Sequence, residues 1–321
     1  MTVYPSVYTI ILNWNNAQDT LGTIRSVLEL DYPNNSILVV DNGSTDGSRE
    51  IIAERYPHVE LLALDKNLGY AEGNNVGIRH ALKAEPKYLF VLNNDTFVDP
   101  PMLTKLVEVL ESDGQIGMAG PKMYCTDPED ALFAAGSTIL WSCGDLWHHG
   151  MFVPESDFEA NIVDNKPVDF IVGCGLLVRS SLIEQIGTLD AAYYLNYEDV
   201  EWGERTRRHG FSVMYVPEAI MWHKVSATLG QASAANTYYM TRNSLRFFAR
   251  NGPVHMRWLP LLRILFRTTR TVGAWSLKAE YRNLQFRRKR DANLLAMRDF
   301  LLGRFGEMGS DVAQVCYGKP T

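Results

Sequence analysis

The sequence lacks the features that would place a protein across a membrane or outside the cell. It contains no run of about 20 apolar residues, so we expect no transmembrane helix. The first residues, 1–6, lack the basic and then apolar pattern of a signal peptide, so we expect no secretion signal there. Internal repeats and low-complexity stretches are absent as well. These absences favour a cytoplasmic, globular protein.

Cysteine is scarce, and its placement suggests neither a zinc site nor a disulfide framework. The four cysteines lie far apart in the sequence, at Cys125, Cys143, Cys174 and Cys316. Zinc sites need closely spaced ligands, and a chain of 321 residues can form its core without disulfides. We therefore expect reduced thiols. With 46% hydrophobic and 21% charged residues, the chain has the composition of a globular protein of one or two domains.

The net charge of −6 conceals an uneven distribution along the chain. Of the 31 Lys and Arg residues, 16 lie from Arg242 onward, where only 5 of the 37 Asp and Glu residues are found. An acidic body with a basic C-terminal segment predicts a partner for that segment. No nucleic acid is expected, because no known binding module is present and the chain is acidic as a whole.

Strands and helices alternate in the first part of the chain. Apolar runs typical of buried strands occur at 7–12, 37–40, 59–64 and 88–92. Helical periodicity, capping residues and prolines predict helices at about 19–30, 46–55 and 100–111, and a further helix after the third strand that ends at about Lys83. This order predicts a parallel sheet with its ligands at the carboxyl ends of the strands. From Gly117 to Gly150 the pattern is irregular; further on, a helix is expected at about 199–209 and a strand at 211–216.

Three acidic clusters follow predicted strands, and the first contains Asp41. A carboxylate directly after a strand can accept a hydrogen bond from a pyrimidine base or a ribose hydroxyl. The residue types of the same stretch, 41–46, also favour a turn, and Asp46 is suited to cap the following helix. The two interpretations are compatible.

A glycine-rich stretch at 66–75 leads into a predicted helix, where backbone N–H groups could hold a diphosphate. Its glycines are not spaced as G-x-G-x-x-G, which disfavours a dinucleotide-binding domain. Gly73 and Gly77 have a second interpretation, in which they allow the helix to pack closely.

The second acidic cluster ends in Asp95. Divalent cations such as Mg²⁺ take oxygen ligands and often share substrate phosphates, so one Asp plus a diphosphate can suffice. Alternatively, Asp95 caps the following turn. His223 follows the last predicted strand; taken alone it is more typical of a packed or surface histidine, although imidazole is also a ligand for Mn²⁺.

The third cluster, at 198–201, contains Glu198 and Asp199. Acidic residues at the start of a helix and Arg205, Arg207 and Arg208 at its end are explained by helix electrostatics alone. A functional interpretation needs a carboxylate that takes a proton from an acceptor hydroxyl. The residues of this cluster by themselves leave both possibilities open.

Taken together, these motifs resemble the inverting glycosyltransferases of family 2, in particular the rhamnosyltransferase-like branch. The resemblance covers about 7–245 and includes the stretches 11–15, 40–47, 67–71, 74–78, 92–95 and 197–201. It implies an α/β chain with the GT-A fold, which has a mostly parallel central sheet flanked by helices. One position departs from the pattern, because Asn93 stands where many members have Asp. Asn is common there in the rhamnosyltransferase-like branch.

The resemblance implies roles for individual residues. Asp199 is expected to be the catalytic base with Glu198 beside it, while Asp95 and His223 bind Mn²⁺ or Mg²⁺. Donor-binding roles are implied for Leu12, Asn13, Trp14, Asp41, Asn67, Gly69, Asn75, Asn94 and Arg242. Tyr239, Arg242 and Asn243 resemble a later Y-x-x-R-N element of the family that contacts the diphosphate or the acceptor.

These expectations define an enzyme and its organisation. A catalytic domain is expected at 1–250, with a nucleotide-sugar-binding half at 1–120 and an acceptor-side half at 121–250. A basic, mainly helical extension is expected at 251–321. The expected donor is a dTDP-, UDP- or GDP-linked sugar, with rhamnose favoured by likeness. The expected acceptor is a hydroxyl of a glycan or lipid-linked molecule used for cell-surface polysaccharide.

Alternatives remain at the level of the sequence. A sugar nucleotidylyltransferase would need a basic, glycine-rich loop near the N-terminus, and the stretch 13–16 is not one. A non-catalytic sugar-nucleotide-binding or scaffold protein would bind the donor without turnover. The basic extension could lie on the inner face of the cell membrane, or pack on the catalytic domain or on a second subunit of a homodimer.

Overall fold

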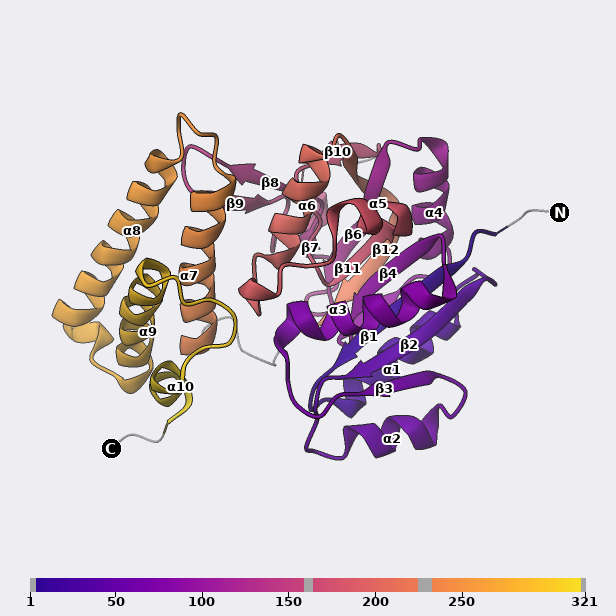
Figure 1. Ribbon diagram of the computed structural model, residues 1–321, viewed down its shortest axis with the longest axis horizontal. Helices are drawn as coiled ribbons and strands as arrows, with labels where there is room; N and C mark the ends of the chain where they lie inside the picture. The colour runs from indigo at the N-terminus through magenta and orange to yellow at the C-terminus, as the bar shows by residue number, and fades with distance from the viewer. Residues whose placement is uncertain (1–3, 159–163, 225–232, 319–321) are drawn as a thin grey trace.

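A computed structural model describes residues 4–158, 164–224 and 233–318. The centre of the fold is a ten-stranded sheet (Figure 1). Its strands are β1 (Val7–Asn13), β2 (Asn35–Asp41), β3 (Glu60–Ala63), β4 (Tyr88–Asn93), β5 (Thr96–Val98), β6 (Ile116–Cys125), β7 (Leu132–Ala134), β10 (Lys166–Val168), β11 (Gly175–Arg179) and β12 (Ser212–His223).

The order of the strands along the sheet is β10-β12-β6-β11-β4-β1-β2-β3, with β5 on β12 and β7 on β6. Four of the seven pairings along this path are parallel, namely β12–β6, β4–β1, β1–β2 and β2–β3. The predicted mostly parallel sheet is therefore confirmed. The antiparallel strand β11 joins the N-terminal half to β6.

Six helices surround the sheet, and three-residue 3₁₀ turns interrupt the connections (Figure 1). The helices are α1 (Ala17–Leu28), α2 (Ser48–Arg55), α3 (Gly69–Ala81), α4 (Met102–Ser112), α5 (Ser180–Ile186) and α6 (Glu198–Arg208). The 3₁₀ turns are η1 (Leu82–Ala84), η2 (Glu155–Asp157), η3 (Ala191–Tyr193) and η4 (Ala279–Tyr281). The four strands and four helices predicted before residue 112 all form, with ends shifted by a few residues.

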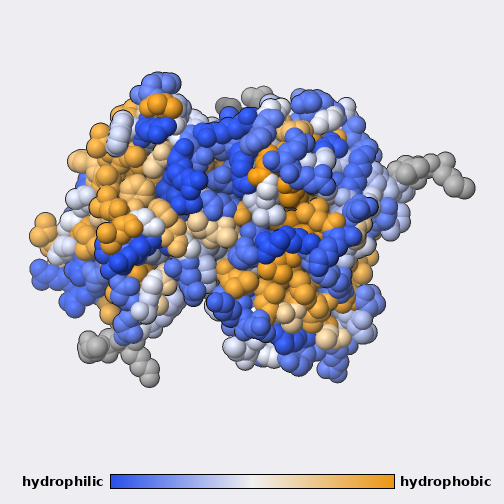
Figure 2. All heavy atoms as spheres, in the orientation of Figure 1, coloured by the Kyte–Doolittle hydropathy of each residue, from blue (hydrophilic) through white to orange (hydrophobic). Residues whose placement is uncertain are grey.

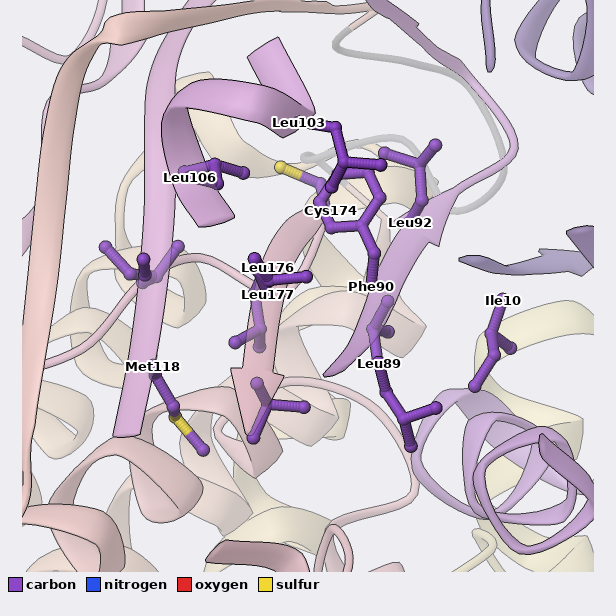
Figure 3. Packing of buried hydrophobic residues seen from close by; sticks show 14 of the residues in the cluster. Ile10, Leu89, Phe90, Leu92, Leu103, Leu106, Met118, Cys174, Leu176 and Leu177 are labelled. Carbon is purple, nitrogen blue, oxygen red and sulfur yellow. The ribbon is translucent and has the colours of Figure 1, made fainter. Parts of the chain in front are cut away.

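The main hydrophobic cluster lies between the sheet and these helices. Figure 3 shows part of it, in which Phe90 and Leu92 of β4 lie near Leu103 of α4. On another side, α3 packs closely on β1 and β2, because a Cβ at Gly77 would lie 2.7 Å from Ile10 and 2.8 Å from Val40. Gly73 and Gly77 thus serve close packing, as the second interpretation of the glycine-rich stretch predicts.

The segment 117–150, whose irregular sequence pattern predicts no element, contains strands. β6 pairs with β11 and β12, and β8 (Ser137–Leu140) forms a hairpin with β9 (Asp145–His148). Gly120 interrupts the apolar alternation of β6. A Cβ there would lie 2.2 Å from Ile171, so close packing requires a glycine at this position.

The described residues from 233 to 318 form four main helices, which lie together at the left of Figure 1. They are α7 (Ala234–Asn251), α8 (Trp258–Leu277), α9 (Leu284–Leu301) and α10 (Ser310–Tyr317). The apolar face of α7 packs on α9 and α10 through Tyr238, Tyr239, Ala296 and Val312. The helical part therefore includes α7 and begins at Ala234. Within the described ranges, no helix has the length and apolar character needed to cross a membrane.

Candidate active site

A cavity of about 900 Å³ lies where β1, β4 and β12 end, and it extends to the C-terminal helices. One wall comes from the sheet and α3: Leu12, Trp14, Asn42, Asn67, Gly69, Tyr70, Asn93, Asn94, Asp95 and His223. The facing wall is Tyr194, Leu195, Asn196, Tyr197, Asn236, Tyr239, Met240, Glu307, Met308, Ala313 and Tyr317. A third side is formed by Phe133, Asp145, Leu146, His148, Met151 and Phe152.

Behind the sheet wall, Asp41 and Asn13 are fully buried. Asn13 Nδ2 donates to Asp41 Oδ2 at 2.8 Å, and the backbone N–H of Ser44 donates to Asp41 Oδ1 at 3.0 Å. Asp41 therefore fixes the turn after β2 and does not line the cavity, whereas Leu12 and Trp14 do. Asp46 accepts from the N–H of Ser48 at 3.0 Å, at the start of α2.

The start of α3 is held by side chains and by a distant loop. Asn67 Oδ1 accepts from Gly69 N–H at 2.7 Å, and the carbonyl of Tyr194 accepts from the N–H groups of Tyr70 and Ala71 at 2.7 and 3.2 Å. These N–H groups already have protein partners, so a free backbone cradle for a diphosphate does not form here. Asn67 and Gly69 still line the cavity.

Two further residues of the expected donor set lie away from the cavity. Asn75 is buried in α3, where its amide exchanges hydrogen bonds with the backbone of Leu189 at 2.9 and 3.0 Å. Arg242 is fully buried, with its guanidinium 5.1 and 5.0 Å from the ring centres of Tyr238 and Tyr239. Both side chains connect parts of the fold, and neither lines the cavity.

Asp95 and His223 come together from positions far apart in the sequence. β5 pairs with β12 so that Thr96 lies opposite His223, and this register brings Asp95 Oδ1 to 3.2 Å from His223 Nε2. The His223 ring lies 4.6 Å from that of Phe133. Asn94, also at the cavity, donates to Thr20 Oγ1 at 2.9 Å.

These residues fit a divalent cation that shares its ligands with a diphosphate. Asp95 offers carboxylate oxygen and His223 offers imidazole nitrogen, while the buried Oδ1 of Asn93 has no hydrogen-bond partner among the described residues. In the same ranges, no three His, Cys, Asp or Glu side chains converge to hold a metal by themselves. Phosphate oxygens would complete the ligand set.

Glu198 and Asp199 begin α6, and their surroundings differ from those of the other acids of that helix. Glu201 pairs with Arg205 at 2.6 Å, and Glu204 pairs with Arg208 at 2.8 Å. Over the described part of the chain, neither Glu198 nor Asp199 has a basic partner. Ion pairs therefore give Glu201 and Glu204 a structural role, whereas Glu198 and Asp199 have only the electrostatics of the helix start to stabilise them.

The half-buried Asp199 carboxylate is fixed by backbone groups. Its Oδ2 accepts from Gly173 N–H and its Oδ1 from Val200 N–H, each at 2.8 Å. Tyr70, which lines the cavity, donates its hydroxyl to the Gly173 carbonyl at 2.5 Å. Asp199 is not itself in the cavity lining and is joined to the cavity wall through Gly173 and Tyr70.

Burial changes the acidity of both carboxyl groups. Desolvation and the neighbouring Asp199 raise the pKa of Glu198 well above its usual value. Desolvation also raises the pKa of Asp199, while hydrogen bonds from Gly173 and Val200 oppose the shift. Asp199 accepts from the backbone N–H groups of two other residues, whereas Oε2 of Glu198 has no hydrogen-bond partner among the described residues, so Glu198 is the member of the pair that keeps a proton to higher pH.

The loop before Asp199 was not predicted as part of the site. Tyr194, Asn196 and Tyr197 line the cavity with positive φ angles of 64°, 66° and 74°. Non-glycine residues rarely adopt this conformation, so surrounding contacts must hold it. Tyr197 is followed directly by Glu198, so the loop sets where the carboxyl pair begins.

Asn243 of α7 supplies those contacts. Its Nδ2 lies 2.9, 2.8 and 2.9 Å from the carbonyl oxygens of Tyr193, Leu195 and Asn196. One sequence signal points to this region, the Y-x-x-R-N element, but Asn243 contacts the loop backbone instead of a ligand. The cavity residues of α10, such as Tyr317, have no motif that could have identified them.

Comparison with known proteins gives consistent results. The model of the family described as Glycosyl transferase family 2 matches residues 8–187. An N-acetylglucosaminyl-diphospho-decaprenol L-rhamnosyltransferase of Mycobacterium tuberculosis is 28% identical over 230 residues, covering 67% of this chain and 74% of that protein. A dTDP-rhamnosyl transferase, RfbF, of Shigella flexneri is 21% identical over 285 residues, covering 86% of this chain and 91% of that protein.

The fold is also similar to that of solved structures. The mannosyltransferase PcManGT from Pyrobaculum calidifontis, in complex with GDP-Man and Mn²⁺, aligns with a TM-score of 0.57 at 16% sequence identity. The alignment covers 94% of this chain and 89% of that chain. At this identity the similarity shows the fold, and the predicted GT-A architecture is thereby confirmed.

Proposed function

Because the chain belongs to glycosyltransferase family 2 and resembles its rhamnosyltransferases, we propose that it catalyses metal-assisted, inverting sugar transfer with Asp199 as the base. The donor is a nucleotide-diphosphate sugar, and the acceptor is a hydroxyl of a glycan or lipid-linked molecule. The observation that carries the proposal is the placement of Asp199. This carboxylate has no basic partner among the described residues and is joined by Gly173 and Tyr70 to the cavity that contains Asp95.

The donor occupies the sheet wall of the cavity in this proposal. Leu12 and Trp14 contact the base and ribose, with Asn13 and Asp41 holding the β1 and β2 ends behind them. Asn67, Gly69 and Asn94 lie along the path of the diphosphate. Asp95 and His223 would hold Mn²⁺ or Mg²⁺ with the phosphates, and such a cation neutralises charge that develops on the leaving diphosphate.

Asp199 performs the proton transfer. It takes the proton of the acceptor hydroxyl, whose oxygen attacks the anomeric carbon while the bond from that carbon to the diphosphate oxygen breaks. The nucleoside diphosphate leaves with the bonding electron pair, and attack from the opposite face inverts the anomeric centre. The raised pKa of Asp199 suits this role, because a base works best when its pKa approaches the working pH.

The identity of the donor is proposed from the relatives. One relative is named as a dTDP-rhamnosyl transferase and another as an L-rhamnosyltransferase acting on a decaprenol-linked diphosphate sugar. We therefore favour dTDP-rhamnose as donor and a lipid-linked glycan as acceptor. UDP- and GDP-linked sugars are the alternatives that the experiment must separate.

Thermal unfolding with nucleotides tests the proposal first. A ligand that binds only the folded state raises the melting temperature. We expect dTDP with Mn²⁺ or Mg²⁺ to stabilise the protein more than UDP, GDP, CDP or NAD, and EDTA to remove most of the shift. Well-folded protein that responds to none of these nucleotides would refute nucleotide-sugar transfer.

A further inference from the structure

We propose that α8 docks the enzyme on an anionic lipid membrane through an exposed apolar ridge, defined here as Trp258, Leu262 and Phe266. These side chains are 70%, 63% and 70% exposed. They are spaced by four residues and therefore lie on one side of the helix. The opposite side of α8 is buried through Leu261 and Ile264. Figure 2 shows apolar residues gathered over the C-terminal helices, at the left of the view.

The ridge is unusual for a water-exposed surface. Large apolar side chains in a row on an exposed helix mark an interaction surface more often than chance exposure. Leu277, near the end of α8, is also 79% exposed and follows Phe266 by about three helical turns. The apolar side of α8 therefore continues along most of its length.

The segment that carries the ridge is rich in basic residues, although Arg267 is paired with Asp145. From Trp258 to Arg290 the sequence contains nine Lys or Arg residues and one acid, Glu280. Arg270 follows the ridge by one helical turn, is exposed, and forms no ion pair with any described residue. Apolar anchors among basic residues are the signature of a helix that lies in the interface of an anionic bilayer.

A basic pocket lies at the far end of α8. Its volume is about 320 Å³, and its lining contains no acidic residue: Trp275, Ser276, Tyr281, Arg282, Arg287 and Arg290. Ser276 follows Trp258 by five turns at about 3.6 residues per turn, so both point to the same side of the helix. The guanidinium groups of Arg282 and Arg287 match the phosphate of a lipid headgroup.

The same charges disfavour a second copy of this chain as the occupant. In a two-fold symmetric dimer the same patch meets itself, so the arginines around one ridge would face those around the other. A span across the bilayer is excluded for α8 itself, which carries Arg263, Arg267 and Arg270 within its length. A helix that lies on the membrane surface can bury its apolar side chains in the bilayer while its basic side chains contact the anionic headgroups.

The proposal assigns a partner to the basic extension, which the sequence alone does not do. It rests on the proposed function only for the reason why membrane docking is useful to the protein. A lipid-linked acceptor is confined to the membrane, so a docked enzyme meets it at high local concentration. Binding to vesicles, by contrast, needs neither donor nor turnover, so the two proposals can be tested separately.

The test is flotation of the full-length protein with phosphatidylcholine vesicles, with and without about 30% phosphatidylglycerol. We expect binding to the anionic vesicles that is about tenfold or more tighter than to neutral ones and that weakens at high salt. W258S/L262S/F266S and R282Q/R287Q should each lose about tenfold or more in binding. I51S, which removes an exposed apolar side chain from α2, is the matched control and should bind as the wild type.

The outcomes separate the possible occupants. Wild-type protein that ignores anionic vesicles, or a ridge variant that binds them normally, overturns the proposal. A concentration-dependent dimer in sedimentation velocity that the ridge variant abolishes would instead assign the ridge to a second copy. Stabilisation of each variant by dTDP and Mn²⁺ checks its fold. If nucleotides stabilise neither the wild type nor any variant, while the wild type still binds anionic vesicles, the proposed transfer reaction is wrong. The proposed membrane-docking surface is then still supported.

Discussion

The side-chain amide of Asn243 lies 2.9 Å from the carbonyl oxygen of Asn196, three residues before Asp199. Asn243 is fully buried in α7, and Asn196 has a positive φ at the cavity. An element from the C-terminal part of the chain thus holds the strained loop that leads to the proposed base. Each such residue costs about 1–3 kcal/mol, so the loop persists only while these contacts hold it.

Asn243→Ala is expected to lower kcat much more than it changes donor KM. The substitution leaves carbonyl groups of the loop without their donor and lowers stability by about 1–3 kcal/mol. Steady-state kinetics and thermal unfolding measure both effects. Asn293→Ala is the control, because Asn293 is a buried asparagine that accepts from Thr241 and does not touch the loop. Equal loss of kcat in both variants would mean that Asn243 acts only through stability.

Asp199→Asn is expected to lower transfer by about 10²–10⁴-fold with little change in donor affinity, because the amide cannot take the proton. The amide oxygen can still accept one of the two backbone hydrogen bonds, so the fold should be retained. Product formation and dTDP binding are measured side by side. Glu201→Gln, two residues further along α6 in a partly buried ion pair with Arg205, is the control. Near-normal turnover of the Asp199 variant would remove Asp199 from the mechanism.

Glu198→Gln is expected to flatten the pH dependence of stability. Burial and Asp199 raise the pKa of Glu198 well above the reference value of 4.5, so the folded state keeps a proton that the unfolded state releases. The wild type must therefore lose stability as pH rises above that reference value toward the folded pKa. Melting temperatures between about pH 5 and about pH 8 should fall less in the variant than in the wild type.

The comparison uses the difference between the two proteins, so titrating groups that do not interact with Glu198 cancel. At the upper end of the pH range the variant should be the more stable of the two, since it buries no carboxylate. Parallel curves for both proteins would show that Glu198 ionises normally in the folded state.

His223→Ala is expected to remove most of the metal-dependent part of stabilisation by a nucleoside diphosphate. The imidazole lies 3.2 Å from Asp95 and is the second ligand in the proposed metal site. Thermal shifts with dTDP are compared with Mn²⁺ and with EDTA. His148→Ala is the control, because His148 lines the same cavity but bonds to Ser137. A full metal response in the His223 variant would contradict the assignment.

Local sequence patterns predicted the N-terminal half of the fold well. The strands β1, β2 and β4 are continuous apolar runs, and turn and capping residues separate them from the helices. β6 was missed because its glycines and Pro121 resemble loop chemistry. These glycines are needed because residues distant in the sequence pack against them, as Ile171 packs on Gly120. Local sequence patterns do not reveal such tertiary contacts.

The site was predictable where a motif falls at a strand end, and less so elsewhere. Asp95 and His223 were named separately, and the pairing of β5 with β12 brings them together. Asp41 and Arg242 were expected at the donor, but both lie outside the cavity lining because the fold uses their charges internally. Tyr194 and Tyr317 were not predicted, since only tertiary packing brings them to the cavity.

Apart from His223, the two walls of the cavity come from separate stretches of the chain. The family model ends at Gly187, while the wall opposite the sheet is made of residues after 193. This division makes the protein suitable for chimeras. In such a chimera, α7 to α10 of this protein would be replaced by those of a relative, together with the 193–197 loop, so that the loop and its Asn243 partner come from the same protein. We expect the chimera to have the acceptor preference of the relative and the sugar-nucleotide preference of this protein.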